Sequence, residues 1–234
     1  MTPNSKINPT TLESDAFKLI EEWKESFREK HKEKASELCQ EYIDSCKFIL
    51  KHRPWEDVED NYNKLLILAI LFKGLQDFVG LAWLTEDKDW HENHKYVEYT
   101  WITLCDCRDR IEFVSQYCQV DVIELVLRSV YKLEEFFKNA FGDGYYSSPE
   151  VLVKKFICNI CQQDTRACSH IAGRLYGGKI CHYLPIEPCI RAVALVKVPK
   201  DPRCRIWSWQ LEGNQIHNVC LITSFSIDEF LSEE

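Results

Sequence analysis

Residues 158–181 read CNICQQDTRACSHIAGRLYGGKIC and place soft metal ligands at the spacing C-x2-C-x6-C-x-H-x10-C. A gap of two residues lets two thiolates from one tight turn bind a single ion, and a second pair of ligands then closes a tetrahedron. Closed sites rich in sulfur are usually structural zinc sites. The stretch therefore predicts a small module organised by a structural Zn2+ ion, and it says little about catalysis.

The first pair of predicted ligands is Cys158 and Cys161. The second pair must come from Cys168, His170 and Cys181, with His182 as a weaker candidate. Because one residue separates Cys168 from His170, both reach a single ion only from a bent loop. We favour Cys158, Cys161, His170 and Cys181, with Cys168 next in order. The competing interpretation is that these are core cysteines that bind no metal.

The composition favours a reducing, cytoplasmic location. The chain has 234 residues, of which 45% are hydrophobic and twelve are cysteines. The first residues, MTPNSK, have no apolar core and no cleavage site, so no secretory signal peptide is expected. Several cysteines fall in helical stretches, where a free thiol acts as a small apolar group. Together these features argue against a secreted disulfide framework.

The charge is distributed unevenly along the chain. The formal net charge is −8, yet residues 151–210 carry ten Lys and Arg against three acidic residues. Thiolates bound to a metal would reduce this positive balance. The sequence thus predicts an acidic body, residues 1–150, joined to a basic metal module.

The first part of the chain has the apolar periodicity of α-helices. Residues 12–52 predict one long amphipathic helix or two in line, which Pro54 ends, and further helices are expected at 56–84, 90–117 and 120–141. Short links favour antiparallel neighbours, so a four-helix bundle is expected. Polar residues interrupt the apolar run LLILAILF at 65–72 before it reaches the length of a membrane span, which indicates a buried helix and no membrane segment.

The last third of the chain has a different composition. Ser148, Pro149 and Glu150 resemble the start of a short helix, whereas residues 191–198 and 218–225 are rich in β-branched residues and predict strands. The predicted fold class is α+β. It comprises a disordered tail at 1–11, a helical bundle at 12–147 and a zinc-binding α+β module at 148–234.

The string C-x2-C-x6-C-x-H-x2-G-x2-Y-x-G-x2-C resembles a zinc-knuckle segment of uncharacterised phage-encoded and other prokaryotic proteins. A strand-like stretch at 192–196 and the sequence PKDPR at 199–203 continue the likeness. It covers residues 150–206, roughly a quarter of the chain, and the helical body resembles no family. The resemblance implies a prokaryotic or phage setting, such as an antiviral or phage-related complex, and carries no enzymatic activity with it.

The predicted function is non-enzymatic recognition or assembly. A protein partner or a second copy would bind through the bundle, and nucleic acid could bind the basic module, because cations interleaved with aromatic rings suit phosphates and unstacked bases. The competing interpretation is that these cations only pair with the acidic bundle. The candidate contacts to nucleic acid are Arg166, Arg174, Lys179, Arg203, Arg205 and Tyr176.

The alternative function is a metal-dependent nuclease of the His-Asn-His type, with His170 as its base. Against it, Ser169 stands where an acidic residue is common, the later Asn is missing, and a histidine that binds structural zinc is not free to act as a base. A second histidine cluster, His91, His94 and Glu98, would share one helix face, where a solvated surface is the simpler interpretation.

Overall fold

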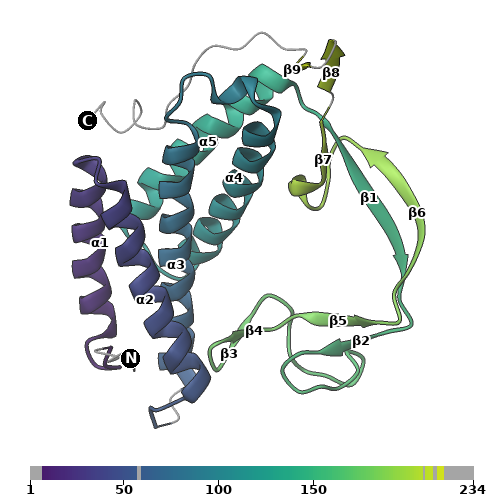
Figure 1. Ribbon diagram of the computed structural model, residues 1–234. Coiled ribbons are helices and arrows are strands. Elements are labelled where there is room, and N and C mark those ends of the chain that lie inside the picture. The colour runs from purple at the N-terminus through teal and green to yellow at the C-terminus, as the bar shows by residue number, and fades with distance from the viewer. Residues whose placement is uncertain (1–6, 57–58, 208, 213–214, 219–234) are drawn as a thin grey trace.

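The structure, a computed structural model, describes residues 7–56, 59–207, 209–212 and 215–218. The helices come first in the chain, and α3 lies at the centre with α2 and α4 beside it (Figure 1). A short 3-10 helix, η1 (Trp90–Glu92), precedes α4. The α-helices of the described residues are α1 (Leu12–Arg28), α2 (Lys32–His52), α3 (Glu59–Leu84), α4 (His94–Ser115) and α5 (Asp121–Phe141).

The stretch 12–52 forms two helices that pack side by side, so the expectation of one helix, or of two in line, is wrong. The chain reverses between them, where Lys30 adopts a left-handed φ of 60° and the backbone N–H of His31 donates to Ser26 O at 2.8 Å. Reversal lets both helices bury their apolar faces against the same core. In the part of the chain that the structure describes, the helical body therefore has five α-helices and not the predicted four, whereas the predicted α+β class is confirmed.

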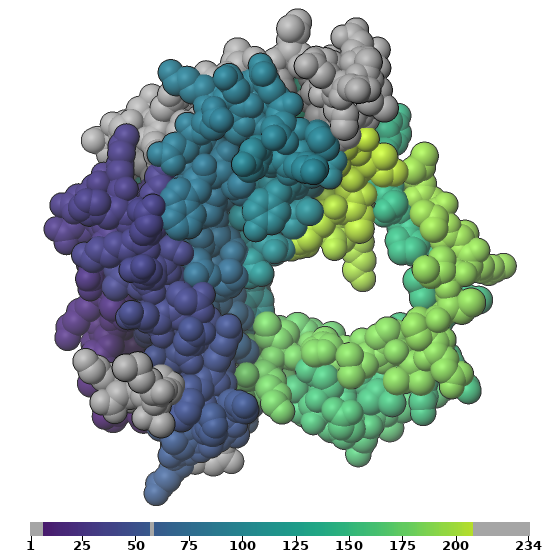
Figure 2. Space-filling view, in the orientation of Figure 1, coloured from purple at the N-terminus to yellow at the C-terminus, as the bar shows by residue number. Residues whose placement is uncertain are grey.

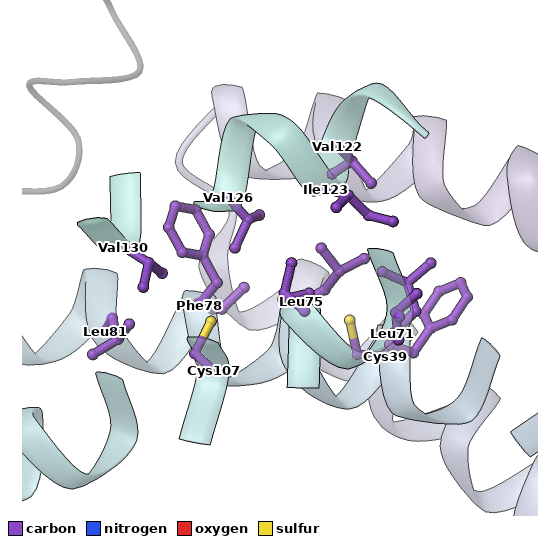
Figure 3. Packing of buried hydrophobic residues seen from close by; sticks show 14 of the residues in the cluster. Cys39, Leu71, Leu75, Phe78, Leu81, Cys107, Val122, Ile123, Val126 and Val130 are labelled. Atoms are coloured by element: carbon purple, nitrogen blue, oxygen red, sulfur yellow. The ribbon is translucent and has the colours of Figure 1, made fainter. Parts of the chain in front are cut away.

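Helix α3 is apolar on nearly all sides because neighbouring helices surround it. By length and composition it could cross a membrane, but 61% of its most apolar window is buried inside the protein. Figure 3 shows α3 side chains packed between residues of α2, α4 and α5. The residues labelled there are Cys39, Leu71, Leu75, Phe78, Leu81, Cys107, Val122, Ile123, Val126 and Val130. Burial thus accounts for the apolar run, as predicted.

The strands of the described residues form small antiparallel sheets. A three-stranded sheet has the order β6-β1-β7, and the others are the pairs β2-β5, β3-β4 and β8-β9. The predicted strand at 191–198 is confirmed as β6, whereas the one at 218–225 falls largely outside the described residues. The bounds are β1 (Tyr145–Leu152), β2 (Lys155–Cys158), β3 (Leu175–Tyr176), β4 (Lys179–Ile180), β5 (Tyr183–Ile186), β6 (Cys189–Val196), β7 (Arg205–Ile206), β8 (Trp209–Glu212) and β9 (Gln215–Asn218).

The helix predicted at Ser148–Glu150 is wrong, because these residues lie within β1. Pro149 stands opposite Val193 of β6. Beyond Tyr146 the described residues place no strand on the other edge of β1, so a proline without an N–H is tolerated there. Pairing with β6, which lies some forty residues further along the chain, overrides the local helix signal.

Among the described residues, the C-terminal part meets the helical body in two regions, through residues 202–218 and through the β3-β4 hairpin, and an opening remains between them (Figure 2). At the first, which we call the arginine joint, η2 (Pro202–Cys204) and β7 lie against α4 and α5. Arg203 donates to Asp106 at 2.6 Å and to Asp109 at 2.5 Å. The buried Arg205 donates to the carbonyl oxygens of Phe141 and Gly142. These ion pairs and hydrogen bonds hold one end of the β-rich part on the bundle.

Candidate metal centre

The first two cysteines lie on a tight turn at the end of β2. The backbone N–H of Cys158 donates to Gln163 O, and the N–H of Gln162 donates to Cys158 O, both at 2.9 Å. Gln162 takes a left-handed φ of 61°. The N–H of Ile160 points at Cys158 Sγ, 3.4 Å away. This turn brings the thiols of Cys158 and Cys161 to one point, as the C-x2-C spacing predicts.

The next two ligands come from a bent loop. The N–H of His170 donates to Cys168 Sγ at 3.2 Å, which curls the chain around the sulfur. Cys168 Sγ then lies 3.4 Å from His170 Nδ1 and 3.4 Å from Cys161 Sγ. The bend therefore allows both residues of the C-x-H pair to reach the same place.

The ligand atoms of Cys158, Cys161, Cys168 and His170 all lie within 4.8 Å of one another. Metal–sulfur bonds of about 2.3 Å at tetrahedral angles place ligand atoms about 3.8 Å apart. The two separations of 3.4 Å, from Cys168 Sγ to Cys161 Sγ and to His170 Nδ1, lie within about 0.4 Å of that spacing, and they far exceed the ~2.05 Å of a disulfide. The cluster can thus hold one metal ion.

A fifth donor, Cys181, lies next to the group. Its Sγ is 3.8 Å from Cys158 Sγ, and the side chain is buried. It stands outside the set of four whose atoms are all mutually close. The structure thus brings all five sequence-predicted ligands together and places Cys168 inside the tight group, with Cys181 at its border.

Asn159, which the ligand spacing does not single out, joins the two halves of the centre. Its Nδ2 donates to Ile180 O at 3.0 Å, and its Oδ1 accepts from the N–H of His182 at 2.8 Å. These bonds fix the link between β4 and β5, which contains Cys181, beside the first turn. An amide side chain has a donor and an acceptor and can bridge two backbone groups in this way. In the sequence, only the position of Asn159 between the two cysteines of C-x2-C indicates that its side chain lies at the metal centre.

Two thiols in the cluster differ in their affinity for a proton. Desolvation acts to raise the pKa of Cys158, but hydrogen bonds from the backbone N–H groups of Cys161 and Ile160 outweigh it and bring the pKa to about 6. Desolvation raises the pKa of Cys168 to about 11, although the N–H of His170 opposes it. Of these two thiols, Cys158 is ionised at the lower pH, and metal binding would require Cys168 to lose its proton.

The hairpin that follows the cluster, β3-β4, attaches the metal centre to the bundle at the second joint, which we call the hairpin joint. The N–H of Gly178 donates to Asn63 Oδ1 at 2.8 Å, and the N–H of Gly177 donates to Glu59 Oε1 at 3.1 Å. Arg53 donates to Gly177 O at 2.9 Å. A turn of two glycines thus sits on the ends of α2 and α3.

The basic and aromatic candidates fall into two groups. Arg174 and Lys179 are exposed, and exposed Arg166 pairs with Asp164, whose pKa it holds well below the usual value. Tyr176 lies inside the module, where its hydroxyl accepts from the N–H of Ile171 and its ring meets that of His170 edge-on. The remaining two, Arg203 and Arg205, form the arginine joint.

The histidines that the sequence suggested as metal ligands or catalytic bases lie in different surroundings. His170 belongs to the metal cluster, which is the one group of three or more potential ligands among the described residues. His91 is buried in η1, and His94 begins α4. They do not form a second ligand group with Glu98 in the part of the chain that the structure describes.

No known protein family, curated protein or solved structure matches this chain. The resemblance to zinc knuckles therefore rests on the Cys and His pattern and on the cluster that it forms.

Proposed function

We propose that this is a non-enzymatic recognition or assembly protein in which a structural Zn2+ ion fixes a small module against a helical body. The observation that carries the proposal is the Cys3His group, whose ligands are close enough for a tetrahedral ion. A closed site of four protein ligands leaves no position for a substrate, which suits a structural ion better than a catalytic one.

The supporting contacts favour the same conclusion. Asn159 ties the first turn of the cluster to Ile180 of β4, and the hairpin that contains β4 rests on Asn63 and Glu59. An ion that orders the cluster would therefore also order the surface that meets the bundle.

We propose that the exposed cations of the module bind a partner that carries phosphate groups. Arg174 and Lys179 lie in solvent beside the metal centre, and such cations attract phosphates. The helical body would serve a protein partner or a second copy. The likeness to phage-encoded and prokaryotic segments extends the proposal to an antiviral or phage-related complex in the cytoplasm.

Native mass spectrometry of the protein, purified without added metal, tests this function. It reports the metal, the oligomeric state and co-purified nucleic acid in one experiment. We expect one zinc per chain. Absence of zinc, or a second labile metal, would contradict the proposal.

Matched cysteine variants test the ligand set. Cys168→Ser should lose zinc, whereas Cys181→Ser should retain most of it, because Cys168 lies within the tight group and Cys181 at its border. The reverse result would assign the fourth position to Cys181.

The nuclease alternative has its own test. Cleavage of nucleic acid with Mg2+ or Mn2+, lost in His170→Ala while zinc content is retained, would show that the protein is an enzyme.

A further inference from the structure

The metal centre contains one more donor than a tetrahedral ion needs. Cys158, Cys161, Cys168 and His170 form the tight group, and the Sγ of Cys181 lies 3.8 Å from that of Cys158. With Cys181 included, the number of thiols at the centre rises from three to four. This difference determines how the sulfurs behave when they are oxidised, because a disulfide consumes thiols two at a time.

The four sulfurs form two close pairs. Cys161 Sγ lies 3.4 Å from Cys168 Sγ, and Cys158 Sγ lies 3.8 Å from Cys181 Sγ. Because the sulfurs of a disulfide are about 2.05 Å apart, each pair has less than about 2 Å to close. Each of the four sulfurs therefore has a neighbour with which it can form a disulfide, and none is left over.

The two pairs differ in their exposure to solvent. Cys161 and Cys168 are half-buried, whereas Cys158 and Cys181 are buried. An oxidant in solution therefore meets the first pair before the second. Oxidation of the first pair removes two of the four metal ligands and opens the site, so that the oxidant can then reach Cys158.

The cysteines of the helical body are protected from the same reaction. The thiolate is the form of cysteine that reacts, and a cysteine bound to a metal has already lost its proton. In the helices, burial raises the pKa of Cys39, Cys46 and Cys105 to about 12. These three cysteines should therefore remain thiols while the cluster is oxidised.

We propose that the metal centre is also a site that hydroperoxides oxidise reversibly, and that Cys181 is the thiol that makes this oxidation reversible. The proposal rests on the proposed function, since it takes Cys158, Cys161 and Cys168 as ligands of the ion.

Each disulfide forms in two balanced steps. In the first, the thiolate of one cysteine attacks a peroxide oxygen. An S–O bond forms, the O–O bond breaks, and the products are a sulfenic acid and hydroxide, or alkoxide from an organic peroxide. In the second, the partner sulfur attacks the sulfenic sulfur, so that an S–S bond forms and hydroxide leaves. A thiol proton or the solvent protonates each leaving group. The two sulfurs lose two electrons, which reduce one molecule of peroxide.

Cys181 determines the fate of Cys158. Once Cys161 and Cys168 have formed a disulfide, Cys158 is the one ligand sulfur that remains. With Cys181 Sγ 3.8 Å away, the sulfenic acid of Cys158 is converted to a disulfide, which a reductant can reverse. Without that partner, further peroxide would oxidise Cys158 to a sulfinic acid, which is irreversible in the absence of a dedicated repair enzyme. Cys181 thus protects the site from permanent loss of the metal.

Release and recovery of zinc by the full chain test the proposal. Protein loaded with zinc is treated with hydrogen peroxide and then with a phosphine reductant and fresh zinc, and its zinc content is measured after each step. We expect the unmodified protein to lose its zinc and to regain most of it. Cys181→Ser should lose its zinc as well and regain little or none. Cys189→Ser, at an exposed cysteine outside the cluster, should behave like the unmodified protein.

Peptide mapping by mass spectrometry gives a second readout. In the oxidised unmodified protein, we expect one disulfide between Cys161 and Cys168 and another between Cys158 and Cys181. In oxidised Cys181→Ser, the peptide that contains Cys158 should gain two oxygen atoms, as a sulfinic acid does.

Two results would overturn the proposal. One is equal recovery of zinc in Cys181→Ser and in the unmodified protein. The other is a disulfide between Cys158 and Cys161 in place of the one with Cys181. The zinc content of the unmodified protein before peroxide is added tests the proposed function separately. A protein without zinc at that stage contradicts the proposed function, whereas a zinc-loaded protein that gives either overturning result contradicts only the oxidation proposal.

Discussion

The backbone N–H of Gly178 donates a 2.8 Å hydrogen bond to Asn63 Oδ1, across 115 residues of sequence. Gly178 has a φ of 75°, and a Cβ placed on it would lie 2.7 Å from Leu50 Cδ2 and 3.0 Å from Tyr62 O. The hairpin of the metal module therefore approaches α2 and α3 so closely that only glycine fits at this position.

This close approach predicts unequal costs for two glycine substitutions. Gly178→Ala should destabilise the protein by clearly more than the 1–2 kcal/mol that a left-handed φ costs an alanine, because Leu50 or the backbone of Tyr62 must also move. Gly173→Ala is the control, since its φ is 84° but its Cβ would meet nothing within 4 Å. Denaturant unfolding measures both. Equal losses would mean that the contact with α3 has no energetic role.

Removal of the metal should loosen the hairpin and leave the bundle folded. Chelation takes away the ion that holds the Cys158 turn and the His170 loop together, whereas α3 and α5 pack through apolar contacts that need no metal. Hydrogen exchange should therefore rise in residues 155–186 and change little in α3. Cys189→Ser, at an exposed cysteine outside the cluster, should keep the full metal content. Unchanged exchange at 155–186 after chelation would argue against a structural ion.

Arg203→Ala should weaken the arginine joint. The guanidinium group bonds Asp106, Asp109 and Asp201, and hydrogen bonds to charged groups contribute about 1.5–3 kcal/mol. We expect a loss of roughly 2 kcal/mol in the free energy of unfolding.

The matched control for Arg203 is Arg166→Ala. Arg166 also binds an aspartate, Asp164, but the pair lies on one exposed loop and should contribute nothing measurable. If the two substitutions had equal effects, the arginine joint would not stabilise the fold.

As the pH rises, the free energy of unfolding of Asp77→Asn should increase relative to that of the unmodified protein. Desolvation raises the pKa of Asp77 above 3.8, although Arg110 and Lys73 oppose it. The folded protein thus keeps a proton that the unfolded chain releases, and its stability falls as the pH rises from 3.8 through the folded pKa. Asparagine has no such proton to lose. Denaturant unfolding at several pH values measures the difference.

Asp121→Asn is a control in which the pH dependence of the stability difference should have the opposite sign. A hydrogen bond from Lys24 lowers the pKa of Asp121, so its ionised form stabilises the folded state above pH 3.8, and this contribution is lost as the pH falls through the folded pKa. The substitution should therefore cost stability at neutral pH. The effect should be small, since the Asp121 side chain is largely exposed. The same pH trend in both variants would contradict these assignments.

Local patterns in the sequence determined much of the architecture. Apolar residues at helical spacing predicted the helices, because a helix must bury one face, and the β-branched run at 191–198 predicted β6. The C-x2-C spacing predicted the turn that brings Cys158 and Cys161 together, since a chain of four residues can close in few ways.

Only the tertiary structure decided the features that depend on distant partners. The reversal at Lys30 depends on the core that α1 and α2 share, and Pro149 is in a strand because β6 pairs with it. Arg203 is positioned by its bond to Asp106 of α4, and Gly178 by its bond to Asn63 of α3. Both helices are far away in the sequence. Periodicity encodes which face of an element is buried. It does not encode which distant group will accept a hydrogen bond, because that depends on how the packed elements meet.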